Sequence, residues 1–323
     1  MKENHNQVEN HEFSEYNKQR YFYYANGLYF NSALKFPELT PAEADSRQAS
    51  VSIDFGFVPE NLDTPVSKGA RFQASPGRFL LQMDDIARFI AIDGKQIIIE
   101  PIGEIKESEI RVFLLASVFG ALAHQRHFLP IHASAILHKG EAVLFAGDSG
   151  AGKSTLAASF LNKGYEVISD DISNISMCKE TDRMSVYPGY AQLKLWANSL
   201  KFLDEKPEDH QSLRPHIEKF GKRIPYFDSH KPVPVKAIYI INIRAGQEAS
   251  IEETKGRRRF NEIAYHTFRQ KLIEGLGVKQ THFTHVQQLS KEVIVKNVNR
   301  NEKIKKLPGL LKLLEEDILN LYS

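Results

Sequence analysis

One short segment combines the residue types that bind phosphate groups. The run Gly147-Asp148-Ser149-Gly150-Ala151-Gly152-Lys153-Ser154 fits the pattern G-x-x-x-x-G-K-[ST] at every position. Glycines let the backbone turn several N–H groups inward, and these groups and the next helix N-terminus form a pocket for anionic oxygens. Lys153 would contact the β- and γ-phosphates of a nucleotide, and the Ser154 hydroxyl would bind Mg²⁺. We therefore expect residues 147–155, up to Thr155, to bind ATP with Mg²⁺.

The context of this motif separates it from a chance match in a glycine-rich turn. Residues 141–146 form an apolar run typical of a buried strand, and residues 153–162 are good helix formers. Gly164 is a plausible end for that helix, and residues 165–169 predict a second strand. The pattern predicts a strand, loop, helix and strand, with the two strands parallel.

Two adjacent carboxylates follow the second strand. Successive residues of an extended chain point to opposite sides, so one of Asp170 and Asp171 can face a metal ion and the other the space beyond the γ-phosphate. A second carboxylate there suggests a general base that takes a proton from an acceptor hydroxyl. The alternative is one metal ligand plus one aspartate that caps a helix or lies in solvent.

Two further residues have weaker claims on this site. His132 precedes a predicted strand at 135–138, where a lone histidine is more often a satisfied core residue. Lys194 lies in an alternating stretch after the turn at 187–190 and could reach phosphate, or be a solvated lysine on a strand. Trp196, at the end of that stretch, is expected to be packed.

The surrounding elements predict two domains. Residues 1–20 form a flexible N-terminus, and residues 21–128 form an antiparallel β domain with hairpin turns at Asn26-Gly27 and Asp93-Gly94, followed by a bridging helix from Glu107. Leu129-Pro130 ends that helix, and residues 129–323 form the domain that carries the glycine-rich loop. Further strands are predicted at 172–177 and 237–243, and helices at 260–274 and from Pro308.

The composition excludes several classes of protein. Lys plus Arg is 42 and Asp plus Glu is 40, so a net charge of +2 argues against a nucleic-acid partner bound by bulk charge. The apolar run at 112–123 is too short to span a bilayer, which takes about 20 residues, so no membrane partner is expected. The chain has one cysteine, Cys178, and no secretory signal, and we expect a cytoplasmic protein. The sequence indicates no oligomeric state.

Other polar clusters are weaker. The basic run at 255–259 suits a solvated helix start, or a contact to nucleotide phosphates or an acidic peptide together with His266 and Arg269. The pairs His124/His127 and His282/His285 have metal-like spacing, but no cysteine or third ligand is near them in the sequence, so zinc is not expected.

The motifs resemble those of a known family when taken together. His132-Ala133-Ser134-Ala135, the Gly147–Ser154 loop, Gly164 and Ser169-Asp170-Asp171 are similar to the catalytic domain of HPr kinase/phosphorylase. The 187–196 segment and the small β domain before a helix look closer to the HPr-kinase-like enzymes that phosphorylate a serine of lasso peptide precursors. The resemblance implies an α/β fold, in which a P-loop kinase domain with a mixed central sheet follows a smaller antiparallel β domain.

The resemblance also implies individual roles. Asp170 would match the acid/base aspartate and Asp171 the metal-binding one, with Ser154 as the other metal ligand. His132 would lie near the transferred phosphoryl group, and Lys194 would stand near the position of an arginine. The leading hypothesis is an ATP- and Mg²⁺-dependent kinase whose acceptor is a serine of a peptide or small protein, such as the C-terminal serine of a lasso peptide precursor. The alternatives are an HPr-type serine protein kinase, a small-molecule kinase, and a nucleotide-dependent switch or assembly ATPase that binds a partner through its β domain.

Overall fold

A computed structural model describes residues 13–43, 50–104, 107–214, 217–227, 230–303 and 306–322. The chain divides into two compact units, one of residues 1–130 with 269–283 and one of residues 131–268 with 284–323. Each unit is described by itself. Residues 1–12 of the predicted flexible N-terminus lie outside the described residues, and Asn17 beyond them exchanges two hydrogen bonds with the backbone of Phe55.

The first unit is built on a nine-stranded sheet of order β3-β1-β2-β4-β9-β8-β7-β6-β5. Its hairpin turns follow the prediction, because Asn26-Gly27 and Asp93-Gly94 all adopt positive φ. The antiparallel prediction is wrong for β4, which pairs in parallel with both β2 and β9. The strands are β1 (Tyr21–Ala25), β2 (Leu28–Ser32), β3 (Thr40–Pro41), β4 (Val51–Phe55), β5 (Ser67–Lys68), β6 (Phe72–Ser75), β7 (Arg78–Met83), β8 (Ala87–Ile92) and β9 (Gln96–Pro101).

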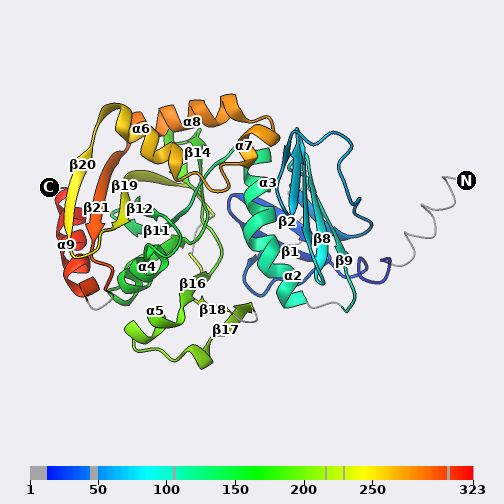
Figure 1. The fold of residues 1–323 in the computed structure, drawn as a ribbon, viewed down its shortest axis with the longest axis horizontal. Coiled ribbons are helices and arrows are strands. Elements are labelled where there is room, and N and C mark those ends of the chain that lie inside the picture. Colours follow the sequence, from blue (N-terminus) through cyan, green and yellow to red (C-terminus); the bar gives the residue numbers. More distant parts are fainter. Residues whose placement is uncertain are drawn as a thin grey trace, which may run out of the picture. The chain divides into compact units, whose positions relative to one another are not determined.

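One long helical segment covers a face of this sheet (Figure 1). It runs through α2 (Glu107–Phe113), a π-helical turn (Leu114–Val118) and α3 (Phe119–Gln125). The predicted bridging helix is therefore part of the core of the first unit, where the ring of Phe119 stacks on that of Phe30 at 4.9 Å. The segment 269–283, with α7 (Leu272–Gly275), belongs to the same unit, and Gly275 packs so closely on Ala74 that a Cβ there would lie 2.8 Å from the alanine Cβ.

The second unit holds a mixed sheet of order β10-β14-β15-β19-β12-β11-β13, with β21 added to β19 and β20 to β21. β12 (Glu141–Gly147), β19 (Val233–Ile243) and β21 (Ile294–Arg300) are parallel neighbours, and β11 (Ala133–His138) runs antiparallel between β12 and β13 (Glu166–Ser169). The parallel direction predicted for β12 and β13 is confirmed, but the two strands are not neighbours. The remaining strands are β10 (Leu129–Ile131), β14 (Ser173–Cys178), β15 (Arg183–Val186) and β20 (Ser250–Thr254).

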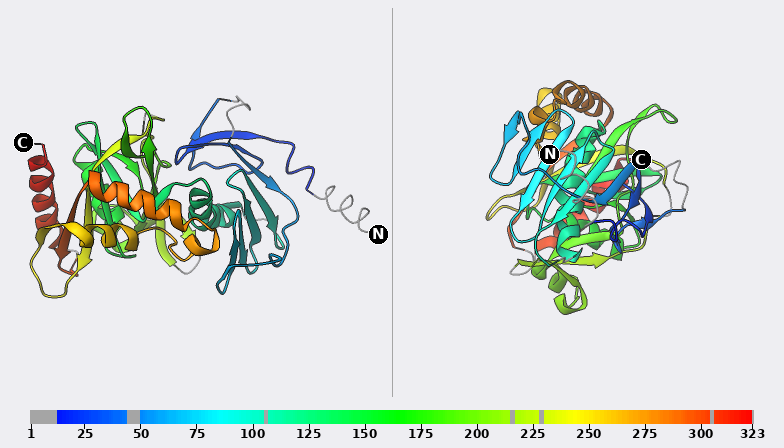
Figure 2. Two further views of the ribbon diagram at one scale, coloured as in Figure 1. Left: turned by 90° about the horizontal axis from the view of Figure 1, so that it is seen from above. Right: turned by 90° about the vertical axis from the view of Figure 1, so that its right-hand side faces the viewer.

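Helices pack on this sheet through apolar faces. α4 (Lys153–Asn162) follows β12, and α9 (Leu307–Asn320) contributes Leu310, Leu314 and Ile318 to one buried cluster with Phe145. Figure 2 shows α9 standing at the end of this unit beside β20 and β21. α8 (Lys279–Glu292) precedes β21.

The helix predicted over 260–274 is wrong in its extent. α6 (Gly256–Tyr265) ends before His266, whose carbonyl accepts a hydrogen bond from the backbone N–H of His132, and Thr267 forms a β-bridge with Ile131. These pairings take the backbone groups that a continuous helix would use, so the helix stops.

Three strands form a small separate sheet in the order β16 (Gln192–Trp196), β18 (Ile217–Arg223) and β17 (Gln211–Arg214). The helix α5 (Ala197–Phe202) follows β16 directly in the chain.

Candidate active site

The glycine-rich loop joins β12 to α4, as the sequence predicts. Gly147, Gly150 and Gly152 all have positive φ, which only glycine adopts at little cost. At Gly147 the space is also closed, because an added Cβ would lie 2.7 Å from the carbonyl oxygen of Ile241 on β19. The parallel pairing of β12 with β19 therefore requires glycine where the loop leaves the sheet.

Lys153 begins α4 and is folded back over this loop. Its Nζ donates hydrogen bonds to the carbonyl oxygens of Gly147 at 2.8 Å and Asp148 at 2.9 Å, and the side chain is buried. Burial lowers the pKa of Lys153 to about 8, and the nearby Asp170 and Asp171 only partly oppose that shift. A buried ammonium group held by two neutral carbonyls is well suited to receive anionic oxygens.

Asp170 lies beneath the loop and is buried. Its Oδ1 accepts hydrogen bonds from the hydroxyls of Ser154 at 2.8 Å and Ser134 at 2.5 Å, and its Oδ2 accepts one from the backbone N–H of Lys194 at 2.9 Å. The resemblance implied an acid/base role for Asp170, but here both of its oxygens are used within the protein, one of them by the predicted metal ligand Ser154.

Asp171 faces the cavity instead. It follows the end of β13 with a φ of +67°, so the side chains of the pair do not simply alternate along one strand. Lys194 Nζ donates to Asp171 Oδ2 at 2.7 Å. Burial by itself would raise the pKa of Asp171, but the charge of Lys194 and the hydrogen bond that it donates lower that pKa well below its usual range. The carboxylate is therefore ionised at neutral pH.

Lys194 connects the two aspartates and is not a solvated lysine. Burial opposes its charge, yet Asp171 and Tyr190 raise the pKa of Lys194 above its ordinary value. Burial raises the pKa of the Tyr190 phenol to about 12. Because β16 supplies both the backbone N–H to Asp170 and the ammonium to Asp171, one strand sets the position of both carboxylates.

His132 completes this end of the site. Its Nδ1 lies 2.9 Å from the carbonyl oxygen of Asp171 and 3.6 Å from Oδ1 of that residue. A carbonyl oxygen can only accept, so Nδ1 carries the proton and Nε2 of a neutral ring keeps its lone pair. Burial, followed by the charge of Lys153, lowers the pKa of His132, so the ring is neutral at pH 7.

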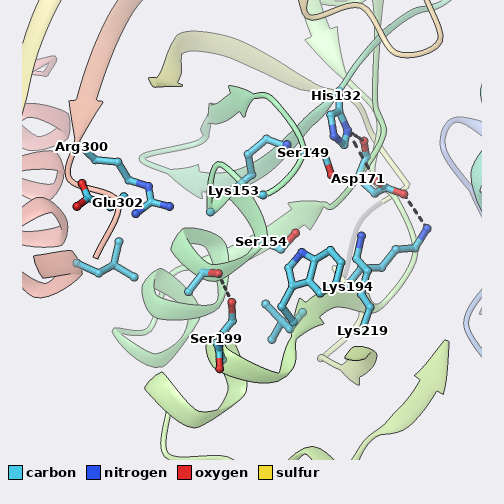
Figure 3. A pocket seen from close by; sticks show the side chains of 17 residues that line it. His132, Ser149, Lys153, Ser154, Asp171, Lys194, Ser199, Lys219, Arg300 and Glu302 are labelled. Atoms are coloured by element: carbon cyan, nitrogen blue, oxygen red, sulfur yellow. Dashed lines mark hydrogen bonds and ion pairs between the residues drawn. The ribbon is translucent and has the colours of Figure 1, made fainter. Parts of the chain in front are cut away.

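These groups line a cavity of about 360 Å³, within the size range of small-molecule sites. In Figure 3, Lys153 and Ser154 occupy the middle, His132, Asp171 and Lys194 lie at one end, and Arg300 and Glu302 lie at the other. The lining residues are His132, Ser149, Gly150, Gly152, Lys153, Ser154, Thr155, Asp171, Lys194, Leu195, Trp196, Asn198, Ser199, Lys219, Arg300, Glu302 and Leu307.

Most of the predicted site residues meet here, and some do not. Asp148 and Ala151 line a separate hollow with His266 on the other side of the loop. Arg258 of the basic run is exposed and does not line the cavity, and Arg269 bonds Ser117 in the first unit. Trp196 is 43% exposed, contrary to the packed position expected, because β16 turns it outward beside Lys219 of β18.

Sequence reasoning missed several polar groups of this site, among them Ser134, Ser199, Lys219 and Arg300. Ser134 was available as part of the His132–Ala135 motif, but nothing in that motif shows which residue its hydroxyl contacts. The Thr155 hydroxyl donates a hydrogen bond to Ser199 Oγ at 2.8 Å. Lys219 and Arg300 come from strands remote in the sequence, and no motif marks them.

The oxygen atoms of this site suit Mg²⁺, the ion that Ser154 is predicted to bind. Mg²⁺ prefers oxygen ligands and is commonly bound by one or two protein groups together with phosphate oxygens. Ser154 Oγ and Asp170 Oδ1 lie 2.8 Å apart at the start of α4, and the ionised Asp171 faces the same cavity. Within the described ranges no cluster of three or more His, Cys, Asp or Glu side chains could hold a metal ion.

Comparisons with known proteins match a family model and solved structures. Residues 100–203 match the family described as SynChlorMet cassette protein ScmC, a stretch that contains the loop, both aspartates and Lys194 but not Arg300. The HPr(Ser) kinase/phosphatase from Coxiella burnetii is similar at 11% identity over 60% of this chain and 99% of that chain, with a TM-score of 0.30. No curated protein matches.

The chain is a mixed α/β protein with several sheets. The P-loop kinase domain and the lasso peptide branch stay predictions. Among the described residues no helix is long and apolar enough to cross a membrane.

Proposed function

We propose that this chain is an ATP- and Mg²⁺-dependent kinase that transfers the γ-phosphate of ATP to a serine hydroxyl of a peptide or small protein. The observation that carries the proposal is the second carboxylate. Both oxygens of Asp170 already accept hydrogen bonds beneath the loop, whereas Asp171 is an ionised group that faces the cavity. A protein that only hydrolyses or binds a nucleotide has less need of a buried lysine to keep a second carboxylate ionised there.

The phosphate chain would lie along the loop and against Lys153. Its anionic oxygens replace the carbonyls of Gly147 and Asp148 as partners of the ammonium, and the charged form of the lysine then gains a true counter-ion. Phosphoryl transfer depends mainly on positioning and on stabilising developing charge, so Lys153 and the loop N–H groups contribute most where the site excludes water.

The acceptor hydroxyl would meet Asp171. Lys194 holds Oδ2, so Oδ1 is the atom left to accept a hydrogen bond from the serine. This orients an oxygen lone pair toward the phosphorus atom, and the hydroxyl proton passes to Oδ1 as the new P–O bond forms and the bond to the ADP oxygen breaks. The neutral His132, whose Nδ1 is bound to the Asp171 carbonyl, holds the backbone of that residue in place.

In this proposal Mg²⁺ would lie on the side of Asp170. Ser154 would hold Mg²⁺ with Asp170 as the acceptor behind its hydroxyl, and Asp171 faces the same space. Bound Mg²⁺ would neutralise charge on the β- and γ-phosphate oxygens. This assignment exchanges the roles that the resemblance to HPr kinase/phosphorylase implied for Asp170 and Asp171.

The acceptor is proposed from the resemblance alone. A lasso peptide precursor with a C-terminal serine is the first choice, and HPr-type serine proteins are the second. No nucleic-acid or membrane partner is part of the proposal, and we place the protein in the cytoplasm.

The test is transfer of label from γ-labelled ATP with Mg²⁺ to peptides that end in serine, each paired with the same peptide ending in alanine. Labelled phosphoserine in the first set alone is the expected result. An HPr-type protein and a pool of small metabolites serve as the other acceptors, with products identified by mass spectrometry. If water is the only acceptor under all these conditions, the protein is a nucleotide-dependent switch or assembly ATPase and the kinase proposal is wrong.

A further inference from the structure

Arg300 lies against the glycine-rich loop at the end of β21. Its Nε donates to the carbonyl oxygen of Ala151 at 2.8 Å and its Nη1 to that of Asn301 at 2.8 Å. The guanidinium lies beside Gly152, where an added Cβ would be 3.6 Å from Nη2. Within the described part of the chain Nη2 makes no hydrogen bond or ion pair, although Glu302 acts on Arg300 through its charge, so one donor of a partly buried cation at the cavity is left for a ligand.

A second cavity of about 420 Å³ begins at this arginine. Arg300 and Leu307 line both cavities, and the second has apolar walls from Ala249, Leu310 and Leu313 beside Gly309 and the polar residues Glu248, Asn301 and Lys306. Apolar walls with a few polar groups are the usual lining of a site for a small planar ligand.

The order of charges along the first cavity gives the bound nucleotide a direction. Figure 3 shows His132, Asp171 and Lys194 at one end, Lys153 and Ser154 in the middle, and Arg300 at the opposite end. If the γ-phosphate meets the acceptor at Asp171, the α-phosphate lies toward Arg300. The nucleoside attached to it must then leave the first cavity at the end where the second begins.

We propose that Arg300 binds the α- and β-phosphate oxygens through Nη2 and that the second cavity holds the base and ribose of the nucleotide. The inference rests on the proposed function, because it assumes that the loop binds a nucleoside triphosphate. It adds to that function a nucleoside-binding site and a residue from outside the loop motif.

Trp196 is the competing platform for the base, because it lines the first cavity and is partly exposed. Two observations place it with the acceptor instead. Its ring already lies 5.8 Å from Lys219 Nζ, and it stands on β16, the strand that carries Lys194. A base stacked on Trp196 would lie on the strand that organises the acceptor end.

Gly309 offers a clean way to fill the second cavity. It lines that cavity in the first turn of α9, a Cβ there meets nothing within 4 Å, and its φ is not positive. Gly309→Trp should therefore block the site without disturbing the backbone, and Gly309→Ala is the matched control, since alanine is well tolerated in a helix. Thermal unfolding of each variant checks that the fold is kept.

The experiment measures the dissociation constants of MgATP and of Mg-tripolyphosphate, which has the phosphates but no nucleoside, for the wild type and each variant. The wild type should bind MgATP more tightly than tripolyphosphate. Gly309→Trp should weaken MgATP by about tenfold or more and leave tripolyphosphate within about twofold, while Gly309→Ala changes neither. Arg300→Ala should weaken both ligands, and Arg300→Lys should restore part of the loss.

The possible failures are distinguishable. If the wild type binds neither ligand, the proposed nucleotide site is absent and this inference falls with it. If MgATP binds but Gly309→Trp leaves its affinity unchanged, the kinase proposal stands and the nucleoside lies elsewhere. If Trp196→Ala, rather than Gly309→Trp, removes the preference for MgATP over tripolyphosphate, the base stacks on Trp196 and the second cavity is not its site.

Discussion

The two ends of the cavity differ in how completely their charges are partnered. At one end Asp171, Lys194 and His132 hold one another through a short ion pair and a hydrogen bond to the backbone. At the other end the hydrogen bonds of Arg300 to the described residues go to neutral carbonyls, Glu302 acts on it through its charge without an ion pair, and apolar side chains continue beyond it. The first arrangement defines a single geometry before any ligand arrives, which suits chemistry. The second provides a cation and a surface, which suits binding.

The hydrogen-bond partners of Asp170 and Asp171 also differ, so the two carboxylates are not interchangeable. Asp170 accepts hydrogen bonds from three donors of the protein, so both of its oxygens are already used. Asp171 has one oxygen held by Lys194 and therefore keeps one for a ligand. The acceptor end should thus control the rate of transfer, and the Arg300 end should control nucleotide affinity.

The largest effect is expected at the acceptor end. Asp171→Asn should lower kcat by about 10²–10⁴-fold, because the amide cannot take the hydroxyl proton. The dissociation constant of MgATP should change by less than about threefold. Steady-state transfer to a serine peptide and nucleotide titration separate the two, and Asp209→Asn, an exposed position, is the control. An equal loss in affinity and rate would show that the two ends do not divide the work.

Breaking the ion pair between Lys194 and Asp171 should lower the free energy of unfolding. Lys194→Met leaves the Asp171 carboxylate, whose side chain is 13% exposed, without its counter-ion, and loss of one partner of a largely buried pair costs about 3–5 kcal/mol. Urea unfolding of the single variants Lys194→Met and Asp171→Asn and of the double variant measures the coupling. The double variant should be more stable than Lys194→Met alone, and additive losses would mean that the pair is not coupled.

The metal-supporting side of the site should show an intermediate effect. Ser154→Ala removes the hydroxyl between Asp170 and the cavity, and the Mg²⁺ concentration for half-maximal transfer should rise by about tenfold or more. Ser159→Ala is the matched control, because that hydroxyl lies on the same helix and, among the residues that the structure describes, donates to the carbonyl of Thr155 alone. An unchanged Mg²⁺ requirement would remove Ser154 from the metal site.

The smallest effect concerns pH. The free protein has the pKa of Lys153 lowered to about 8, and phosphate binding favours the charged form and raises it. MgATP affinity should therefore be highest below pH 8 and fall by up to about tenfold per pH unit above it. Titrations between pH 7.5 and 9.5 test this, and Lys153→Arg, which stays charged, should flatten the profile. A flat profile in the wild type would mean that Lys153 is not the group that meets the phosphates.

Much of the site could be predicted from local pattern. The loop, the helix after it and the pair Asp170-Asp171 lie within 25 residues of one another, and each obeys a short-range rule of turn, helix or strand. The division of labour between the aspartates could not be predicted, because it depends on hydrogen bonds from Ser134 and from β16 that reach across the sheet. The broken helix after Tyr265 and the parallel pairing of β4 have the same origin in contacts between distant segments.

The sequence by itself determined the glycine-rich loop, because glycine conformation, the strand before the loop and the helix after it are local properties of residues 141–162. Only the tertiary structure decided which aspartate faces the cavity, that Lys194 is buried beside it, and that Arg300 reaches the loop from β21. Hydrogen-bond partners and desolvation are set by what packs against a side chain, and the packing elements here come from strands separated by as many as 149 residues.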